Sequence, residues 1–163
     1  MRHAKSDWDS DFGSDHERPL NGRGLHSARL MGRVLAGQAR SPHLVISSTA
    51  VRARTTAELA IEAGDWGSDL QLDRSLYDSG PERVLETAAG APDVGILMLV
   101  GHQPTWSMLV RDITGAKAEI KTATIAVVQL EIESWDELPD SEGSLIALLH
   151  PRQFVGSEFD RGD

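Results

Sequence analysis

Arg2 and His3 stand side by side at the start of the chain, and their chemistry suits the transfer of a phosphoryl group. A phosphoryl acceptor must offer a lone pair, and cations must hold the phosphoryl oxygens while the bond to the leaving group breaks. Unprotonated imidazole supplies the lone pair, and the planar guanidinium group of arginine donates two hydrogen bonds to a phosphate at once. We therefore predict that His3 becomes transiently phosphorylated, with Arg2 as a clamp beside it.

Arg52 and His102 are the distant side chains that we expect to join this pair. Arg52 lies in the first turn of a helix predicted to follow the apolar run 43–47, and His102 directly follows the apolar run 94–100. In an open α/β sheet, ligands bind beyond the carboxyl ends of the strands, where helix N-termini also favour anions. Both residues should therefore lie at one edge of the sheet. His102 can act there as a neutral hydrogen-bonding group or as a further cation, and the sequence leaves both states open.

The elements that must position these residues alternate between strands and helices. Apolar residues at helical spacing, with Gly and Pro at the ends, predict helices over residues 23–38, 50–63, 81–89 and 104–115. Short β-branched runs predict strands over 43–47 and 94–100 and a late antiparallel or edge pair over 124–132 and 145–149, whereas 71–79 is either a brief strand or a loop. This order predicts an α/β fold with a three-layer open sheet, mostly parallel, and helices on both faces.

The composition limits the kind of protein this can be. With 163 residues the chain suits a single domain, which we place at residues 1–155, followed by a disordered charged tail at 156–163. It has no cysteine, no signal peptide and no long apolar run, so we expect a cytoplasmic protein that does not contact membranes. The formal net charge of −9 argues against binding to nucleic acid, but a local arginine cluster can still hold an anionic substrate. We expect a monomer.

Each candidate residue also has a simpler interpretation. His3 can be a surface residue near a terminus, Arg52 a solvated helix residue, and His102 a turn or capping residue. The other histidines lack a metal-ligand spacing such as His-Glu-x-x-His, so we expect no metal site; they are His16, His26, His43 and His150. The sequence also lacks the Gly-x-Ser-x-Gly turn of serine hydrolases and the phosphate-binding loop of nucleoside triphosphatases.

Five short segments form an ordered pattern over almost the whole chain. They are Arg2-His3-Ala4-Lys5-Ser6, Glu17-Arg18-Pro19-Leu20, Ser48 through Arg52 to Glu58, Val100-Gly101-His102-Gln103-Pro104, and Thr122 to Thr124 with Pro151-Arg152. In this order and spacing they resemble the histidine phosphatase superfamily, also called phosphoglycerate-mutase-like, and especially its small SixA-type phosphohistidine phosphatases. The resemblance implies the phosphoglycerate-mutase-like fold and a phosphohistidine enzyme intermediate, with neither a metal nor an organic cofactor.

The resemblance also assigns roles by position. It implies that His3 is the nucleophile, that Arg2 and Arg52 bind the phosphoryl group, that His102 is the second histidine of the site, and that Arg18 also reaches the phosphate. The favoured substrate is phosphohistidine on a partner protein. The alternatives are a phosphatase for a small metabolite or nucleotide monophosphate, and an inactive module that binds phosphate or docks a partner.

Two features depart from the family pattern. Family members normally carry an apolar strand before the Arg-His pair, whereas this sequence begins at Met1, so the usual first strand is expected to be missing; we favour an upstream start over a gap in the sheet. Mutase-like relatives also place a glutamate near residues 72–77 as proton donor, and the candidates in this chain are Asp73, Asp78 and Asp7. Imidazole leaves as a neutral group once its ring is protonated, so the missing glutamate favours phosphohistidine over an alkoxide ester.

Overall fold

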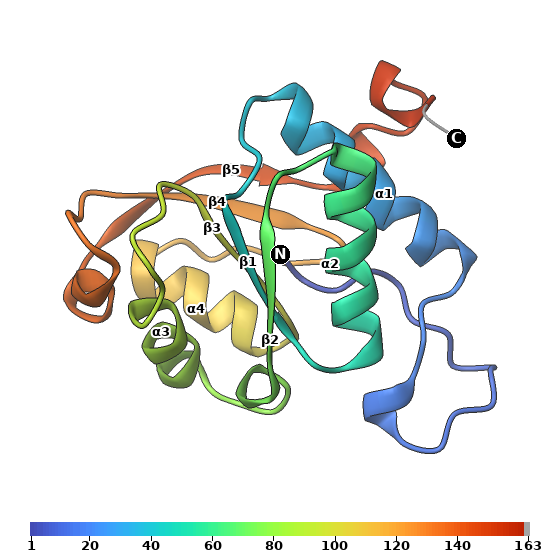
Figure 1. The fold of residues 1–163 in the computed structure, drawn as a ribbon, viewed down its shortest axis with the longest axis horizontal. Coiled ribbons are helices and arrows are strands. Elements are labelled where there is room, and N and C mark those ends of the chain that lie inside the picture. The colour runs from blue at the N-terminus through green and yellow to red at the C-terminus, as the bar shows by residue number, and fades with distance from the viewer. Residues whose placement is uncertain (162–163) are drawn as a thin grey trace.

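A parallel sheet of three strands in the order β2-β1-β3 lies at the centre of the computed structural model, which describes residues 1–161. The strands are β1 (Leu44–Ser48), β2 (Asp69–Asp73) and β3 (Leu97–Val100). Helices α1 (Gly22–Gly37) and α2 (Val51–Gly64) cover one face of the sheet, and α3 (Pro81–Ala89) and α4 (Thr105–Thr114) cover the other (Figure 1). The predicted α/β architecture with helices on both faces is therefore confirmed.

The central strand β1 connects the two apolar cores. Val45 packs in the core that contains α1 and α2, whereas Leu44 and Ile46 pack in the core that contains α3 and α4. Successive side chains of a strand point to opposite faces, so an uninterrupted apolar run is what a strand buried on both faces requires. Because both cores hold β1 in place, the helix that follows its carboxyl end has a fixed starting point.

The remaining elements follow the predicted order closely. Strands β4 (Ile125–Leu130) and β5 (Gly143–Leu149) form the expected late antiparallel pair. The ambiguous stretch 71–79 contains the end of β2 and a short 3-10 helix, η2 (Arg74–Leu76). Within residues 1–161, no helix is both long enough and apolar enough to cross a membrane.

The first three residues lie between β3 and the segment that leads into β4. The backbone N–H of His3 donates to Gly101 O at 2.9 Å, and that of Arg2 donates to Thr124 O at 3.0 Å. A cavity of about 540 Å³ is lined by Met1, by residues of β3 and β4, and by apolar side chains of α4 and the following segments. Arg2 also forms an isolated parallel bridge with Gly101, so these residues pair with the chain just beyond β3.

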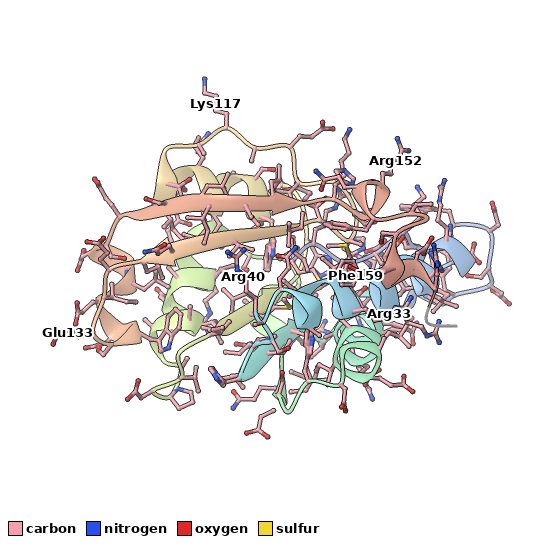
Figure 2. The ribbon with its side chains drawn as sticks, turned by 90° about the horizontal axis from the view of Figure 1, so that it is seen from above. Arg33, Arg40, Lys117, Glu133, Arg152 and Phe159 are labelled. Carbon is pink, nitrogen blue, oxygen red and sulfur yellow. The ribbon has the colours of Figure 1, made fainter. Side chains whose placement is uncertain are left out.

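The segment after residue 155 corrects the predicted disordered tail. Glu158–Asp160 form a short 3-10 helix, η5, that packs against α1. Arg33 on α1 donates from Nε to Phe159 O at 2.6 Å, and Figure 2 shows the two residues close together. The ring and the backbone carbonyl of Phe159 make the contacts that hold this segment. The charge of the segment alone did not predict them. Residues 162 and 163 of the predicted tail lie outside the described residues.

Candidate active site

His3 is buried and presents one ring nitrogen for reaction. Its Nδ1 lies 2.7 Å from Ala4 O, and because a carbonyl oxygen only accepts hydrogen bonds, Nδ1 carries the proton of the neutral ring. Burial is the largest cause that lowers the pKa of His3, and it outweighs the hydrogen bond to Ala4. With the neighbouring His102, Arg52 and Arg2 it lowers this pKa to about 3. At neutral pH the ring is therefore uncharged, and the lone pair of Nε2 can act as a nucleophile.

Thr56 on α2 ties the loop that carries His3 to the helix that carries Arg52. The Thr56 hydroxyl accepts the backbone N–H of Ala4 at 2.9 Å and donates to Arg52 O, one helical turn back, at 2.6 Å. Its side chain is fully buried. A β-branched residue with a hydroxyl can make both bonds at once, so the fold fixes His3 relative to the first turn of α2.

Arg52 and Arg18 are buried guanidinium groups joined by a single carboxylate. Arg52 Nη2 donates to Asp15 Oδ2 at 2.9 Å, while Arg18 Nε and Nη2 donate to Asp15 Oδ1 at 3.1 and 2.8 Å. Arg18 also donates to the Ser6 hydroxyl, and its guanidinium carbon lies 3.6 Å from the centre of the Trp8 ring. These contacts bring the second and third arginines predicted from the sequence to one place.

His102 completes the group that we call the Arg-His cluster (Arg2, His3, Arg18, Arg52 and His102). Its ring centre lies 5.2 Å from that of His3, and burial together with the charge of Arg52 lowers the pKa of His102 to about 4. His102 Nε2 lies 2.9 Å from Ser48 Oγ, which already accepts a backbone N–H. If the serine hydroxyl donates to Nε2, the neutral ring carries its proton on Nδ1. The neutral state, which the sequence left open, is therefore the one that the environment of this ring favours.

Several buried nitrogen atoms of the cluster are suited to bind an anion. Within residues 1–161, Arg2 Nε, Arg52 Nε and His102 Nδ1 have no hydrogen-bond partner in the protein, although such buried groups normally have one. The three guanidinium groups and Asp15 leave a formal charge of +2 when both histidines are neutral. A phosphoryl dianion matches both this charge and these donors. In the same part of the chain, no group of three or more His, Asp or Glu side chains is placed to hold a metal ion.

Three carboxylates were predicted from the sequence as candidate proton donors: Asp7, Asp73 and Asp78. Asp7 Oδ1 accepts the backbone N–H of Asp9 at 2.9 Å, and Asp73 Oδ1 accepts that of Ser75 at 2.8 Å, so both serve local loop structure. Asp78 is exposed. No hydrogen bond or ion pair described for residues 1–161 links any of them to the cluster. The role of any of the three as proton donor therefore stays a prediction.

Besides Trp8, two residues that the sequence analysis did not select make polar or ring contacts with the cluster or its carboxylate. Asp15 bridges two of its arginines, and Tyr77 donates from its hydroxyl to Asp15 Oδ2 at 2.9 Å. The Tyr77 ring also makes edge contacts with His102 and His16, with ring centres 5.5 and 4.8 Å apart. The spacing of Asp15 three residues before Arg18 was the only signal in the sequence that could have indicated the first of these.

The comparisons with known proteins agree with this geometry. A sequence profile of the histidine phosphatase superfamily (branch 1) matches residues 1–79. An uncharacterized protein of Mycobacterium tuberculosis strain H37Rv is 32% identical over 164 residues, which cover 93% of this chain and 100% of that protein. An uncharacterized protein of Mycobacterium leprae is 31% identical over 166 residues, with the same coverage.

Solved structures extend the comparison to the fold. SixA from Agrobacterium tumefaciens, a candidate phosphohistidine phosphatase, is 28% identical with a TM-score of 0.79, and the match covers 93% of this chain and 95% of that chain. A protein histidine phosphatase SixA complexed with tungstate shares the fold with a TM-score of 0.81 at 23% identity, over 94% of this chain and 96% of that chain. The chain belongs to the histidine phosphatase superfamily. Within that superfamily it is of the SixA type.

Proposed function

We propose that this protein removes phosphate from phosphohistidine on a partner protein, through a phosphohistidine intermediate on His3. The observation that supports this proposal most directly is the neutral, oriented imidazole of His3 inside the Arg-His cluster. An anion that binds the unpaired donors of Arg2, Arg52 and His102 comes to lie beside the reactive nitrogen. Positioned donors of this kind account for much of the rate enhancement in phosphoryl transfer.

In the first step, His3 Nε2 attacks the phosphorus atom in line with the bond to the leaving group. A bond forms between Nε2 and phosphorus, the bond to the leaving nitrogen breaks, and its electron pair stays on that nitrogen. His3 keeps its proton on Nδ1, so the phosphorylated ring is cationic. The carbonyl oxygen of Ala4, 2.7 Å from Nδ1, stabilises this charge.

In the second step, water attacks the phosphorus atom of phosphorylated His3. The bond between phosphorus and Nε2 breaks, the electron pair returns to Nε2, and both protons of the water leave with the product, which is dihydrogen phosphate. Because Nδ1 is already protonated, His3 departs as neutral imidazole and needs no external acid. The arginines of the cluster stabilise the charge on the phosphoryl oxygens in both steps.

The carboxylates near the site support a nitrogen leaving group. Partial burial works to raise the pKa of Asp15, but hydrogen bonds from Arg18 and Tyr77 and the charge of Arg52 outweigh it and lower this pKa to about 2. Asp15 is thus ionised at neutral pH and cannot protonate an alkoxide. A protonated imidazole ring leaves without such help. The SixA structure at 28% identity carries the name of a phosphohistidine phosphatase, which points to the same substrate class.

Trapping the intermediate tests the proposal. The protein is mixed with a phosphohistidine-containing protein labelled on phosphorus, quenched in alkali, and digested so that the label can be mapped. We expect an acid-labile label on the peptide that contains His3, and its loss in His3→Ala. His43→Ala is the matched control, because His43 lies just before β1, at the end of the strand away from the cluster. Label on another residue, or turnover retained in His3→Ala, would contradict the proposed mechanism, and turnover of small phosphate esters alone would contradict the substrate.

A further inference from the structure

Asp15 is the exposed member of an otherwise buried set of charges. Its side chain is 46% exposed, whereas those of Arg18 and Arg52 are 6% and 7% exposed. Oδ1 accepts two hydrogen bonds from Arg18, and Oδ2 accepts one from Arg52 and one from Tyr77. The carboxylate is therefore held in a fixed orientation while part of it faces solvent.

The leaving group of a bound substrate must pass close to this carboxylate. In-line displacement places the leaving group on the side of the phosphorus atom opposite His3. His3 is only 7% exposed, so a leaving group that belongs to a protein has to extend away from it, toward the exposed side of the cluster. Asp15 is the exposed member of the set and is bonded to two of the arginines that would hold the phosphoryl oxygens.

Charge balance then discriminates between leaving groups. A phosphoryl dianion would neutralise the formal charge of +2 on the three arginines and Asp15. Any additional charge on the substrate would then meet the exposed carboxylate of Asp15. A positive leaving group is attracted to this carboxylate, and one that becomes negative is repelled.

We infer that Asp15 is a specificity-determining residue that selects phosphorylated nitrogen groups with a protonated ring over phosphate esters whose leaving oxygen becomes negative. The inference rests on the proposed function and defines the substrate class further. The ring nitrogen of phosphohistidine that bears no phosphoryl group is protonated, and the positive charge of the ring is attracted to the carboxylate of Asp15. When the phosphorus–nitrogen bond breaks, the electron pair goes to the departing nitrogen and the ring leaves neutral, with its proton retained. In an aryl ester the electron pair stays on oxygen as a phenolate, beside the carboxylate.

Asp15→Asn is expected to change kcat/KM differently for substrates with the two kinds of leaving group. Values of kcat/KM are measured for phosphoimidazole and for para-nitrophenyl phosphate, with the wild-type protein and with Asp15→Asn. We expect the ratio of kcat/KM for phosphoimidazole to kcat/KM for the ester to fall by about tenfold or more in Asp15→Asn. This is the effect expected from losing one unit-charge contact near the surface. Asp15→Ser should behave like Asp15→Asn, whereas Asp15→Glu should retain most of the ratio.

Asp11→Asn is the control for loss of one negative charge from the same loop. Asp11 is exposed and no contact links it to the cluster within residues 1–161, so its ratio should match the wild-type ratio. The inference would be overturned if kcat/KM changed equally for both substrates, or if the ratio stayed within about threefold of wild type in both Asp15→Asn and Asp15→Ser. Either result would leave the proposed function intact. Wild-type protein that turns over the ester but not phosphoimidazole would refute both.

Discussion

Replacing Arg52 by alanine tests whether the cluster binds a phosphoryl group. Arg52 is 5% exposed and lies in the first turn of α2, directly after the strand that both cores hold in place. Two of its nitrogens donate to Asp15, at 2.6 Å to the backbone oxygen and 2.9 Å to the carboxylate, and Nε has no partner within residues 1–161. The substitution therefore removes one donor that can reach a phosphoryl oxygen directly and one support of Asp15.

The expected loss of activity follows from this geometry. Removing a single positioned donor from a site that stabilises transition-state charge typically lowers kcat by about 10²- to 10³-fold, or about 3 to 4 kcal/mol. We expect Arg52→Ala to lower kcat/KM by at least about 10²-fold. The kcat/KM of Arg52→Lys should fall between those of the wild type and Arg52→Ala, because an ammonium group keeps the charge but cannot form the planar pair of hydrogen bonds.

The stability of the variant separates loss of chemistry from loss of fold. Two guanidinium groups, those of Arg18 and Arg52, share the carboxylate of Asp15, so removing Arg52 relieves repulsion as well as breaking an ion pair. We expect the Tm of Arg52→Ala to equal or exceed that of the wild type, as is common for charges retained for function. Both kinetics, on an aryl phosphate, and thermal unfolding are measured on the same preparations.

Arg54→Ala is the matched control for this experiment. Arg54 lies two residues further along α2, is 54% exposed and pairs only with Glu58 in the described residues, so its loss should change kcat/KM by less than about twofold. A change below about threefold in Arg52→Ala, with a folded protein, would show that Arg52 does not act on the phosphoryl group. A large loss accompanied by a much lower Tm would refute the reasoning about charge repulsion.

Three further substitutions test how the fold positions and tunes the nucleophile. Thr56→Val leaves the buried backbone N–H of Ala4, beside His3, without its partner at 2.9 Å. The free energy of unfolding in urea should therefore fall by about 1 to 3 kcal/mol, and kcat/KM should fall as well. Thr56→Ser keeps the hydroxyl and should retain both values. In Gly24→Ala, the new Cβ would lie 2.1 Å from Lys5 O, so unfolding in urea should show a loss of about 1 to 3 kcal/mol that Gly22→Ala, with no atom within 4 Å, does not share. The pKa of His3 is about 3 in the folded protein and 6.5 as its ordinary value, so the unfolded chain binds the proton first and stability is lost as pH falls through this window. The slope attributable to His3 is at most about 1.4 kcal/mol per pH unit, and urea titrations should show a smaller slope in His3→Gln; equal slopes would refute the low pKa.

The sequence predicted the cluster where its residues follow a regular element. Arg52 and His102 could be placed because each comes directly after an apolar strand, and the carboxyl ends of parallel strands share one edge. The helix boundaries were predictable for the same reason, since apolar spacing, Gly and Pro are local signals. The position of a residue can thus be predicted when it directly follows a regular strand or helix.

Residues on irregular segments could not be placed in this way. Asp15 contacts Arg52, 37 residues away in the sequence, and Tyr77, 62 residues away. Neither Asp15 nor Tyr77 lies in a helix or strand with an apolar period. The carboxylates chosen from the sequence, such as Asp73, have the right chemistry but cap nearby backbone groups instead. Charge likewise predicted disorder for the carboxyl end, where Phe159 packs against α1. Tertiary contacts thus decided the positions of Asp15, Tyr77 and Phe159, whereas a local cap engages Asp73.

The low pKa of His3 affects the two steps of the proposed reaction in different ways. Before the substrate binds, burial and the neighbouring cations keep the ring unprotonated, which secures a lone pair but lowers the basicity of the nucleophile. A bound phosphoryl dianion offsets the charge of the arginines, so we expect the basicity of His3 to rise when the substrate is in place. After transfer, the same cations favour departure of a neutral imidazole, because a cationic ring is costly beside guanidinium groups. The cluster therefore makes His3 a usable nucleophile in the first step and a good leaving group in the second, which is the combination that hydrolysis through a phosphohistidine requires.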